Sequence, residues 1–235
     1  MSVTPDSARA VGLPAALDAG QRRLRELLPG LTDDVTRAPS ALPGWSRAHV
    51  LSHIEGVGLA LARQARYALR GKLIDVYDGG RPARNAAIEA GQRRGAAQLR
   101  AALTDALDEV EASWSGVGPE DWQRPVRYRD GVLLDAGLAW WRELEIHTTD
   151  ALLGPSVTDW SQPFAAHVAE FLAPRVPAGV RLTLTAVDSP WTWTRGEGTP
   201  VAVAGRLTDL AAWLAGRHPA GPLTGDPLPE LGPWP

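Results

Sequence analysis

A carboxylate and an imidazole stand four residues apart in the segment WWRELEIHTTD, at Glu143 and His147. The segment has a helical pattern, and side chains four residues apart on a helix leave the same face one turn apart. A pair so placed can bind one metal ion, and a helical bundle supplies further ligands from a facing helix. Such a pair can equally be a weak surface interaction, so the spacing alone leaves both interpretations open.

A third ligand is available in the segment RAHVLSHIEG, which contains His49 and His53. His53 borders the apolar stripe that includes Val50 and Ile54, whereas His49 is expected further round, towards solvent. We therefore prefer His53. Two histidines and one carboxylate suit zinc with an open coordination position, and they also suit non-haem iron. The open position can polarise a carbonyl, lower the pKa of a bound water, or hold an external thiolate.

The other acidic and histidine residues near this pattern carry less weight. Glu145 and Asp150 are expected to point away from the face of Glu143, with Glu145 on a solvated face. His167 and His218 lack a partner at a ligand spacing, so we expect surface or helix-cap roles for them.

Two arginines stand at places where a guanidinium could bind a carboxylate. Arg84 follows a glycine-rich loop in GGRPARN, and Arg217 closes an apparent helix in AAWLAGRHPAG. A cation at the end of a helix also interacts favourably with the helix dipole. From the residues alone, a structural role is the favoured interpretation for both.

The periodicity of the chain predicts two regions. Four long amphipathic helices favour a bundle, with Ser46 capping the second and Gly95 a point where the third can break; they are expected at 13–28, 47–69, 83–114 and 133–153, with a loop at 75–82. Beyond these, period-two and helical segments favour a small α+β domain: helices at 164–172 and 207–214, and strands at 180–187, 191–194 and 201–204. We expect domains at 1–158 and 159–235.

Composition excludes several classes of function. The chain has 235 residues, a net charge of −3 and no basic stripe, which argues against a nucleic-acid partner. It has neither a leader-like apolar start nor a membrane-length apolar run, so a cytoplasmic location is expected. Lys72 is the only lysine, which favours a GC-rich genome such as that of an actinobacterium. The absence of cysteine excludes disulfides and protein thiolates, so any thiol chemistry needs an external thiol.

Several segments together resemble a known family. They are LPGWSRAHVLSHI, YDGGRPARNAAIEAG, WWRELEIHTTDALLG, DLAAWLAGRHPAGPLTG and LPELGPWP, in that order. This set is similar to the mycothiol-dependent maleylpyruvate isomerase family of actinobacteria. The resemblance implies an α+β fold: an N-terminal four-helix, DinB-like metal-binding bundle and a smaller C-terminal α/β domain.

The resemblance also implies roles for individual residues. The family's zinc ligands fall on His53, Glu143 and His147, its catalytic arginine falls on Arg217, and the arginine of its ARN motif falls on Arg84. Arg217 and Arg84 are thereby implied to bind substrate.

The chain departs from the family pattern at one position near these residues. Family members often have asparagine four residues after the histidine that matches His53, and this chain has Val57 there. A polar group near the expected metal is replaced by an apolar one, which bears on the substrate more than on the metal.

The activity implied by the resemblance is the mycothiol-dependent isomerisation of maleylpyruvate to fumarylpyruvate, with zinc or another divalent metal and a small-molecule substrate. Two other functions remain open: a mycothiol S-transferase that releases a conjugate, and a non-catalytic metal-binding or regulatory protein. The first two would share one metal and one thiol, and only the product separates them.

Overall fold

The structure is a computed structural model that describes residues 5–235. Contacts within the chain divide it into two compact units, Met1–Leu153 and Gly154–Pro235. Among the described residues, no helix has both the length and the apolar character needed to cross a membrane.

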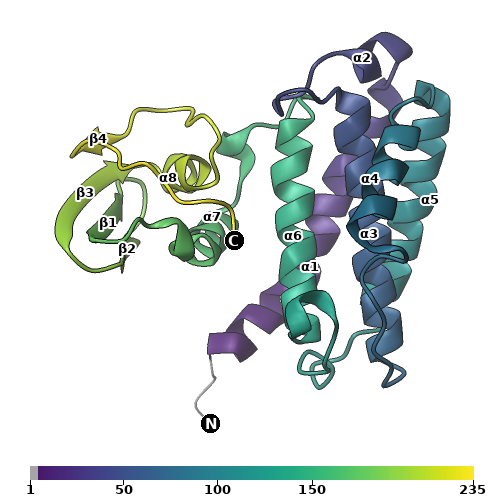
Figure 1. Ribbon diagram of the computed structural model, residues 1–235, viewed down its shortest axis with the longest axis horizontal. Helices are drawn as coiled ribbons and strands as arrows, with labels where there is room; N and C mark the ends of the chain where they lie inside the picture. The colour runs from purple at the N-terminus through teal and green to yellow at the C-terminus, as the bar shows by residue number, and fades with distance from the viewer. Residues whose placement is uncertain (1–4) are drawn as a thin grey trace. The chain divides into compact units, whose positions relative to one another are not determined.

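The first unit is a helical bundle (Figure 1). Helix α3 packs against α5, α6 and α4, while α1 packs against α5 and α6. Its interior is filled by apolar side chains such as Leu51, Leu103 and Trp140, each at most 1% exposed. The predicted bundle is thus confirmed. The long helices are α1 (Pro5–Leu27), α3 (Arg47–Ala68), α5 (Ala96–Ser115) and α6 (Leu133–Asp150), and the shorter ones are α2 (Asp33–Arg37) and α4 (Gly80–Gly91).

Local chemistry explains where these helices begin. Ser46 caps α3, as predicted, by accepting a hydrogen bond from the backbone N–H of His49. The predicted third helix is two helices, α4 and α5, because residues 92–95 are not helical. This interruption includes Gly95, where a break was expected. The predicted loop at 75–82 is wrong at its end, since α4 already starts at Gly80. Pro82 fits there because the N–H groups of a first helical turn have no partner within the helix.

The second unit holds a four-stranded sheet with the order β2-β1-β3-β4 and two α-helices. Strand β1 pairs antiparallel with β2 and parallel with β3, and β3 pairs antiparallel with the short β4. Buried and exposed residues alternate along β1, so that Leu182 and Leu184 are fully buried. The elements are α7 (Gln162–Phe171), β1 (Val180–Ala186), β2 (Thr192–Arg195), β3 (Thr199–Gly205), α8 (Leu207–Leu214) and β4 (Thr224–Gly225).

The α+β class is therefore confirmed, and β4 is the strand that sequence analysis missed. It has only two residues, too few to show an alternating pattern. Four short 3₁₀ helices complete the structure, at Leu28–Gly30, Tyr128–Asp130, Val157–Asp159 and Ala173–Arg175.

The close packing of α3 on α6 can be tested at Gly58. A Cβ atom there would lie 2.9 Å from Cη2 of Trp140 on α6 and 3.3 Å from Cγ2 of Val110 on α5. We expect Gly58→Ala to lower the free energy of unfolding by about 1–3 kcal/mol, because a packed core resists an added methyl group. Urea denaturation measures this.

The matched control is Gly56→Ala on the same helix. Gly56 is exposed, and an added Cβ would meet no atom of the described residues within 4 Å. Alanine there should stabilise the helix by up to about 1 kcal/mol through its higher helix propensity. Equal effects of the two substitutions would contradict close packing at Gly58.

Candidate metal centre

His53 of α3 meets Glu143 and His147 of α6 in the interior of the first unit. Nε2 of His53 lies 3.0 Å from Oε2 of Glu143, and Nε2 of His147 lies 3.2 Å from the same oxygen. The two imidazole rings meet edge to face with centroids 4.5 Å apart. One potential ligand atom from each residue lies within 4.8 Å of the others. The structure thus brings together the three residues that the sequence singled out.

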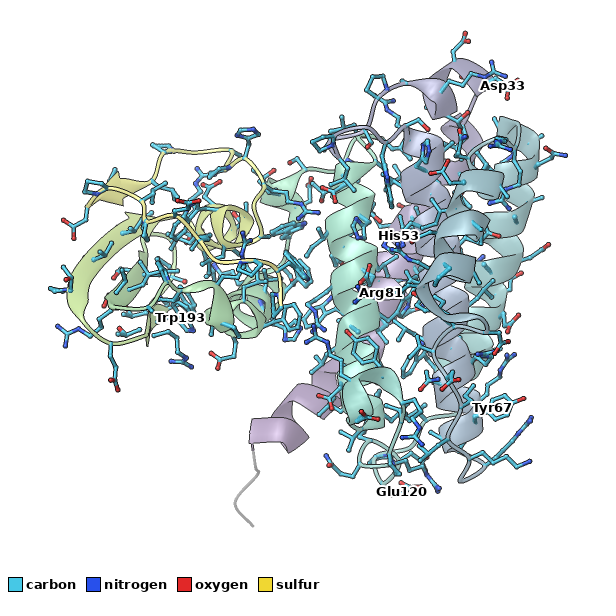
Figure 2. All side chains as sticks on the ribbon, in the orientation of Figure 1. Asp33, His53, Tyr67, Arg81, Glu120 and Trp193 are labelled. Carbon is cyan, nitrogen blue, oxygen red and sulfur yellow. The ribbon has the colours of Figure 1, made fainter. Side chains whose placement is uncertain are left out.

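The helices that carry these residues are neighbours because α3 packs on α6. Figure 2 shows His53 on α3 within the bundle, away from its two ends. The His53 side chain is 6% exposed and that of His147 is 17% exposed, whereas that of Glu143 is 31% exposed. Glu143 is therefore the most solvent-accessible member of a largely buried cluster.

Asp150 fixes the orientation of the His147 ring. Its Oδ2 lies 2.9 Å from Nδ1 of His147, and its side chain is 1% exposed. This contact turns Nε2 of His147 towards Glu143, and the charged ring donates to both carboxylates, from Nδ1 to Asp150 and from Nε2 to Glu143. The expectation that Asp150 points away from the cluster is wrong. It stands three residues after His147, a spacing that also places side chains on one helix face, and that spacing is the signal that was missed.

The electrostatics of the cluster follow from burying a carboxylate between two imidazoles. Burial opposes the charged form of Glu143, but hydrogen bonds to His147 and His53 outweigh it and hold the Glu143 pKa well below its usual range. Burial also opposes charge on His147, yet Asp150 and Glu143 raise its pKa to about 9. For His53, burial dominates and lowers the pKa despite the hydrogen bond to Glu143.

Arg84 is the fourth sequence-predicted site residue that the first unit places at this cluster. Its Nη2 lies 3.1 Å from Nδ1 of His53, and its Nη1 donates to Oδ1 of Asn85 at 3.0 Å. Burial raises the pKa of nearby Tyr77, although a hydrogen bond with Arg84 acts against that shift. Arg84 thus does more than start a helix, which is the role that the residues alone favoured.

Arg217 belongs to the second unit and follows α8. Its backbone N–H donates to the carbonyl of Ala212 at 2.8 Å, and its Nη1 donates to the carbonyl of Ala215 at 2.7 Å. These bonds match the helix-end role expected from sequence. The residue also lines an open groove of about 620 Å³, together with Trp213 and His218. The groove leaves room for a ligand-binding role as well.

The remaining predictions near the cluster had mixed outcomes. His49 is not directed to solvent: its side chain is 14% exposed, hydrogen-bonds Ser46 through Nδ1 and stacks on Trp45.

Glu145 is not on a solvated face either, because it is 7% exposed and pairs with Arg23 of α1 at 2.7 Å. Space for that pair comes from Gly20, where a Cβ would lie 3.0 Å from Oε1 of Glu145. His218 is exposed, as expected.

The donor set fits a divalent metal ion. It offers two imidazole nitrogens and one carboxylate oxygen, a combination that binds zinc in sites with an open position. Asp150 supplies the outer carboxylate that metal-binding histidines commonly use. Val57, four residues after His53 on α3, is buried at 6% exposure and adds no polar atom.

Comparisons with known proteins identify a family and a shared fold. The family described as the mycothiol maleylpyruvate isomerase N-terminal domain matches residues 17–152, more than half of the chain. Two solved structures of the mycothiol-dependent maleylpyruvate isomerase, one of a histidine-to-alanine mutant, match over 100% of both chains. Each has a TM-score of 0.83, at 20% and 21% sequence identity. This similarity shows a shared fold. No curated protein sequence matches the chain.

The raised pKa of His147 can be measured in the metal-free protein. We expect its imidazole to titrate near pH 9, because Asp150 and Glu143 stabilise the charged ring. Since the folded pKa is above the ordinary value of 6.5, this interaction stabilises the fold fully below about pH 6.5. Its contribution is then lost as the pH rises through about 9. Histidine side-chain NMR in the presence of a chelator gives the pKa directly.

The control for this titration is Asp150→Asn, which removes one of the two carboxylates. The His147 pKa should then fall, and the loss of stability between neutral and alkaline pH should shrink with it. A His147 pKa that stays near 6.5 in the unmodified protein would show that the carboxylates do not charge the ring.

Proposed function

Because the chain belongs to the mycothiol maleylpyruvate isomerase family, we propose that it is a metal- and mycothiol-dependent enzyme that isomerises maleylpyruvate to fumarylpyruvate. One observation carries this proposal. His53, Glu143 and His147, the residues on which the family's metal ligands fall, form a single cluster with ligand atoms within 4.8 Å of one another. All three lie inside the matched residues 17–152.

The reaction needs a nucleophile that the chain does not contain. Maleylpyruvate is a cis enone, and its double bond does not rotate at a useful rate. A thiolate adds to the alkene carbon that is β to the ketone, and the π electrons of the alkene move towards the ketone oxygen. The product is an enolate in which the former double bond is a single bond that can rotate. After rotation the enolate re-forms the ketone and the trans alkene, and the thiolate leaves unchanged. With no cysteine in the chain, mycothiol is the proposed source of that thiolate.

The chain's own residues have distinct tasks in this proposal. His53, Glu143 and His147 would hold a divalent metal, with zinc the first candidate, which when bound lowers the pKa of a thiol. Asp150 keeps the Nδ1 proton of His147 in place, and the low pKa of Glu143 keeps it an anionic donor at neutral pH.

The two arginines are proposed to act on the substrate. Arg84, already within the cluster's hydrogen-bond network, would bind one substrate carboxylate. Arg217 would bind a carboxylate and stabilise the negative charge that forms on the enolate oxygen. A guanidinium is suited to both tasks because it stays charged and donates two parallel hydrogen bonds.

Val57 favours a second candidate function, a mycothiol S-transferase. An apolar residue replaces the asparagine that family members often have, and it is buried at 6% exposure on the helix that carries His53. An apolar side chain near the candidate metal site could accommodate a different electrophilic substrate. The thiol would then stay covalently bonded to that substrate after addition. The same cluster and thiol would then serve conjugation.

The deciding experiment measures turnover of maleylpyruvate with and without mycothiol, with the metal content determined on the same sample. We expect turnover only with both metal and thiol, and a product of the same mass as the substrate. A product heavier by one mycothiol would establish the transferase. Absence of any thiol-dependent turnover would support the non-catalytic alternative.

Metal affinity tests the role of Asp150. We expect Asp150→Asn to weaken zinc binding about 10–100-fold, because an outer carboxylate fixes the ring orientation and raises the basicity of the ligand. Competition with a chromophoric chelator measures the dissociation constant. Asp105→Asn, the same change at an exposed position of α5, should leave the affinity unchanged. Equal affinities of the two variants would remove Asp150 from the metal site.

Arginine substitution tests the proposed substrate contacts. Arg217→Ala should lower kcat about 10²–10³-fold, the usual cost of losing one donor to a developing oxyanion, while metal content stays the same. Arg181→Ala, at an exposed position of β1, is the control in the same unit. Turnover that survives Arg217→Ala in an assay validated with the unmodified protein would exclude the role given to Arg217.

A further inference from the structure

The last residues of the sequence form a segment that is tied to the end of α8. We call residues 228–234 the strap. The backbone N–H of Gly232 donates to the carbonyl of Arg175 at 2.8 Å, and Nε of Arg175 donates back to the carbonyl of Gly232 at 2.8 Å. Nη1 of Arg175 also donates to the carbonyl of Leu214, the last residue of α8. Arg175 therefore links the strap to the helix end that carries Arg217.

The strap places an indole ring beside two guanidinium groups. Cζ of Arg217 lies over the Trp234 ring, 5.7 Å from its centroid, and Cζ of Arg175 lies over it at 6.0 Å. Both distances are within the range of an attractive cation–π contact. The two cations are close enough to repel, and this repulsion adds to burial in lowering the Arg175 pKa. The ring offsets part of that repulsion, and a bound anion would relieve more of it.

Arg217 is consequently held by two kinds of contact. Its Nη1 is anchored on the Ala215 carbonyl at 2.7 Å, and its guanidinium packs on Trp234. Gly216 has a φ of +70°, a left-handed backbone conformation that suits glycine, and it ends α8 just before Arg217. A flexible arginine side chain loses rotamer entropy when a ligand fixes it in one orientation. The contacts with Ala215 and Trp234 already restrict the Arg217 side chain, so that ligand binding costs it less entropy.

The held guanidinium belongs to the wall of an open groove. The groove of about 620 Å³ is lined by Arg175 and Arg217, with His218, Trp213 and one acidic residue, Glu230. Two arginines against one carboxylate give the wall a net positive charge. A carboxylate is the ligand class that a paired guanidinium wall recognises.

From these contacts we infer that Trp234 and Arg175 are positioning residues that hold the Arg217 guanidinium in one orientation for a substrate carboxylate. The inference rests on the proposed function. It explains the orientation of the proposed substrate-binding arginine by its contacts with the strap and by the bonds of Arg175 that hold the strap in place. It gives a role to Trp234, a large apolar side chain that is 45% exposed and so lies outside the core.

The experiment compares Trp234→Leu, Trp234→Phe and Trp191→Leu. Trp234→Leu removes the aromatic face, Trp234→Phe keeps one, and Trp191 is a half-exposed tryptophan of the same unit that stacks on Trp193. The first readout is the Nε–Hε signal of Arg217 in ¹H–¹⁵N NMR, which the indole ring current displaces. The second is calorimetric binding of maleate, a cis dicarboxylate probe. The third is kcat and KM for maleylpyruvate.

We expect Trp234→Leu to shift and broaden the Arg217 signal, to weaken maleate binding about tenfold, the upper part of a cation–π effect, and to raise KM more than it lowers kcat. Trp234→Phe should restore most of each change, and Trp191→Leu should cause none. Because Trp234 is half exposed, the variants are expected to fold, and circular dichroism checks this.

An Arg217 signal and maleate affinity that are unchanged in Trp234→Leu would overturn the inference. So would equal losses in Trp191→Leu, which would point to a general structural effect. Failure of the proposed function looks different: the unmodified protein would not isomerise maleylpyruvate, while the NMR and maleate results would still decide the role of the strap.

Discussion

The approach of α3 to α6 is the constraint on which the candidate metal centre depends. His53 can reach Glu143 and His147 only if the two helices lie close enough for their side chains to touch, and Gly58 permits that approach by leaving space for Trp140. The same contact buries the apolar stripe of α3. The packing of the two helices therefore also sets the positions of the three candidate metal ligands.

Burying three ionisable groups together would be costly without internal compensation. A carboxylate moved from water into the bundle loses hydration, and the loss is offset here by hydrogen bonds to His53 and His147. Asp150 extends the arrangement with a second carboxylate, so that the four residues hold two acidic and two basic groups. The hydrogen bonds among these four side chains therefore fix the relative positions of the three candidate ligands within the packed helices.

Sequence analysis predicted the parts of the structure that periodicity determines. The helices around His53 and Glu143 follow the 3.6-residue repeat, and their facing positions follow from the four-residue spacing. It failed where a residue's partner lies on another element. Glu145 was expected in solvent because the pattern of its own helix gave no reason to bury it, whereas α1 supplies one with the Arg23 guanidinium and with the space at Gly20. Strand β4 was missed because pairing with β3, rather than any pattern of its own, makes it a strand.

The roles of the arginines were the hardest to predict, and the reason is physical. A guanidinium at a helix end looks the same in sequence whether it caps carbonyls or binds a ligand, and Arg217 has the contacts of a cap while also lining a groove. In the proposed function the two roles would support each other, because a side chain anchored on a carbonyl and an indole ring has less freedom to lose when it binds an anion. The strap residues that provide the ring come from a proline-rich segment with no periodicity. Arg175 connects that segment to α8 through hydrogen bonds to Gly232 and Leu214. These are tertiary contacts, and no local pattern in the sequence predicts them.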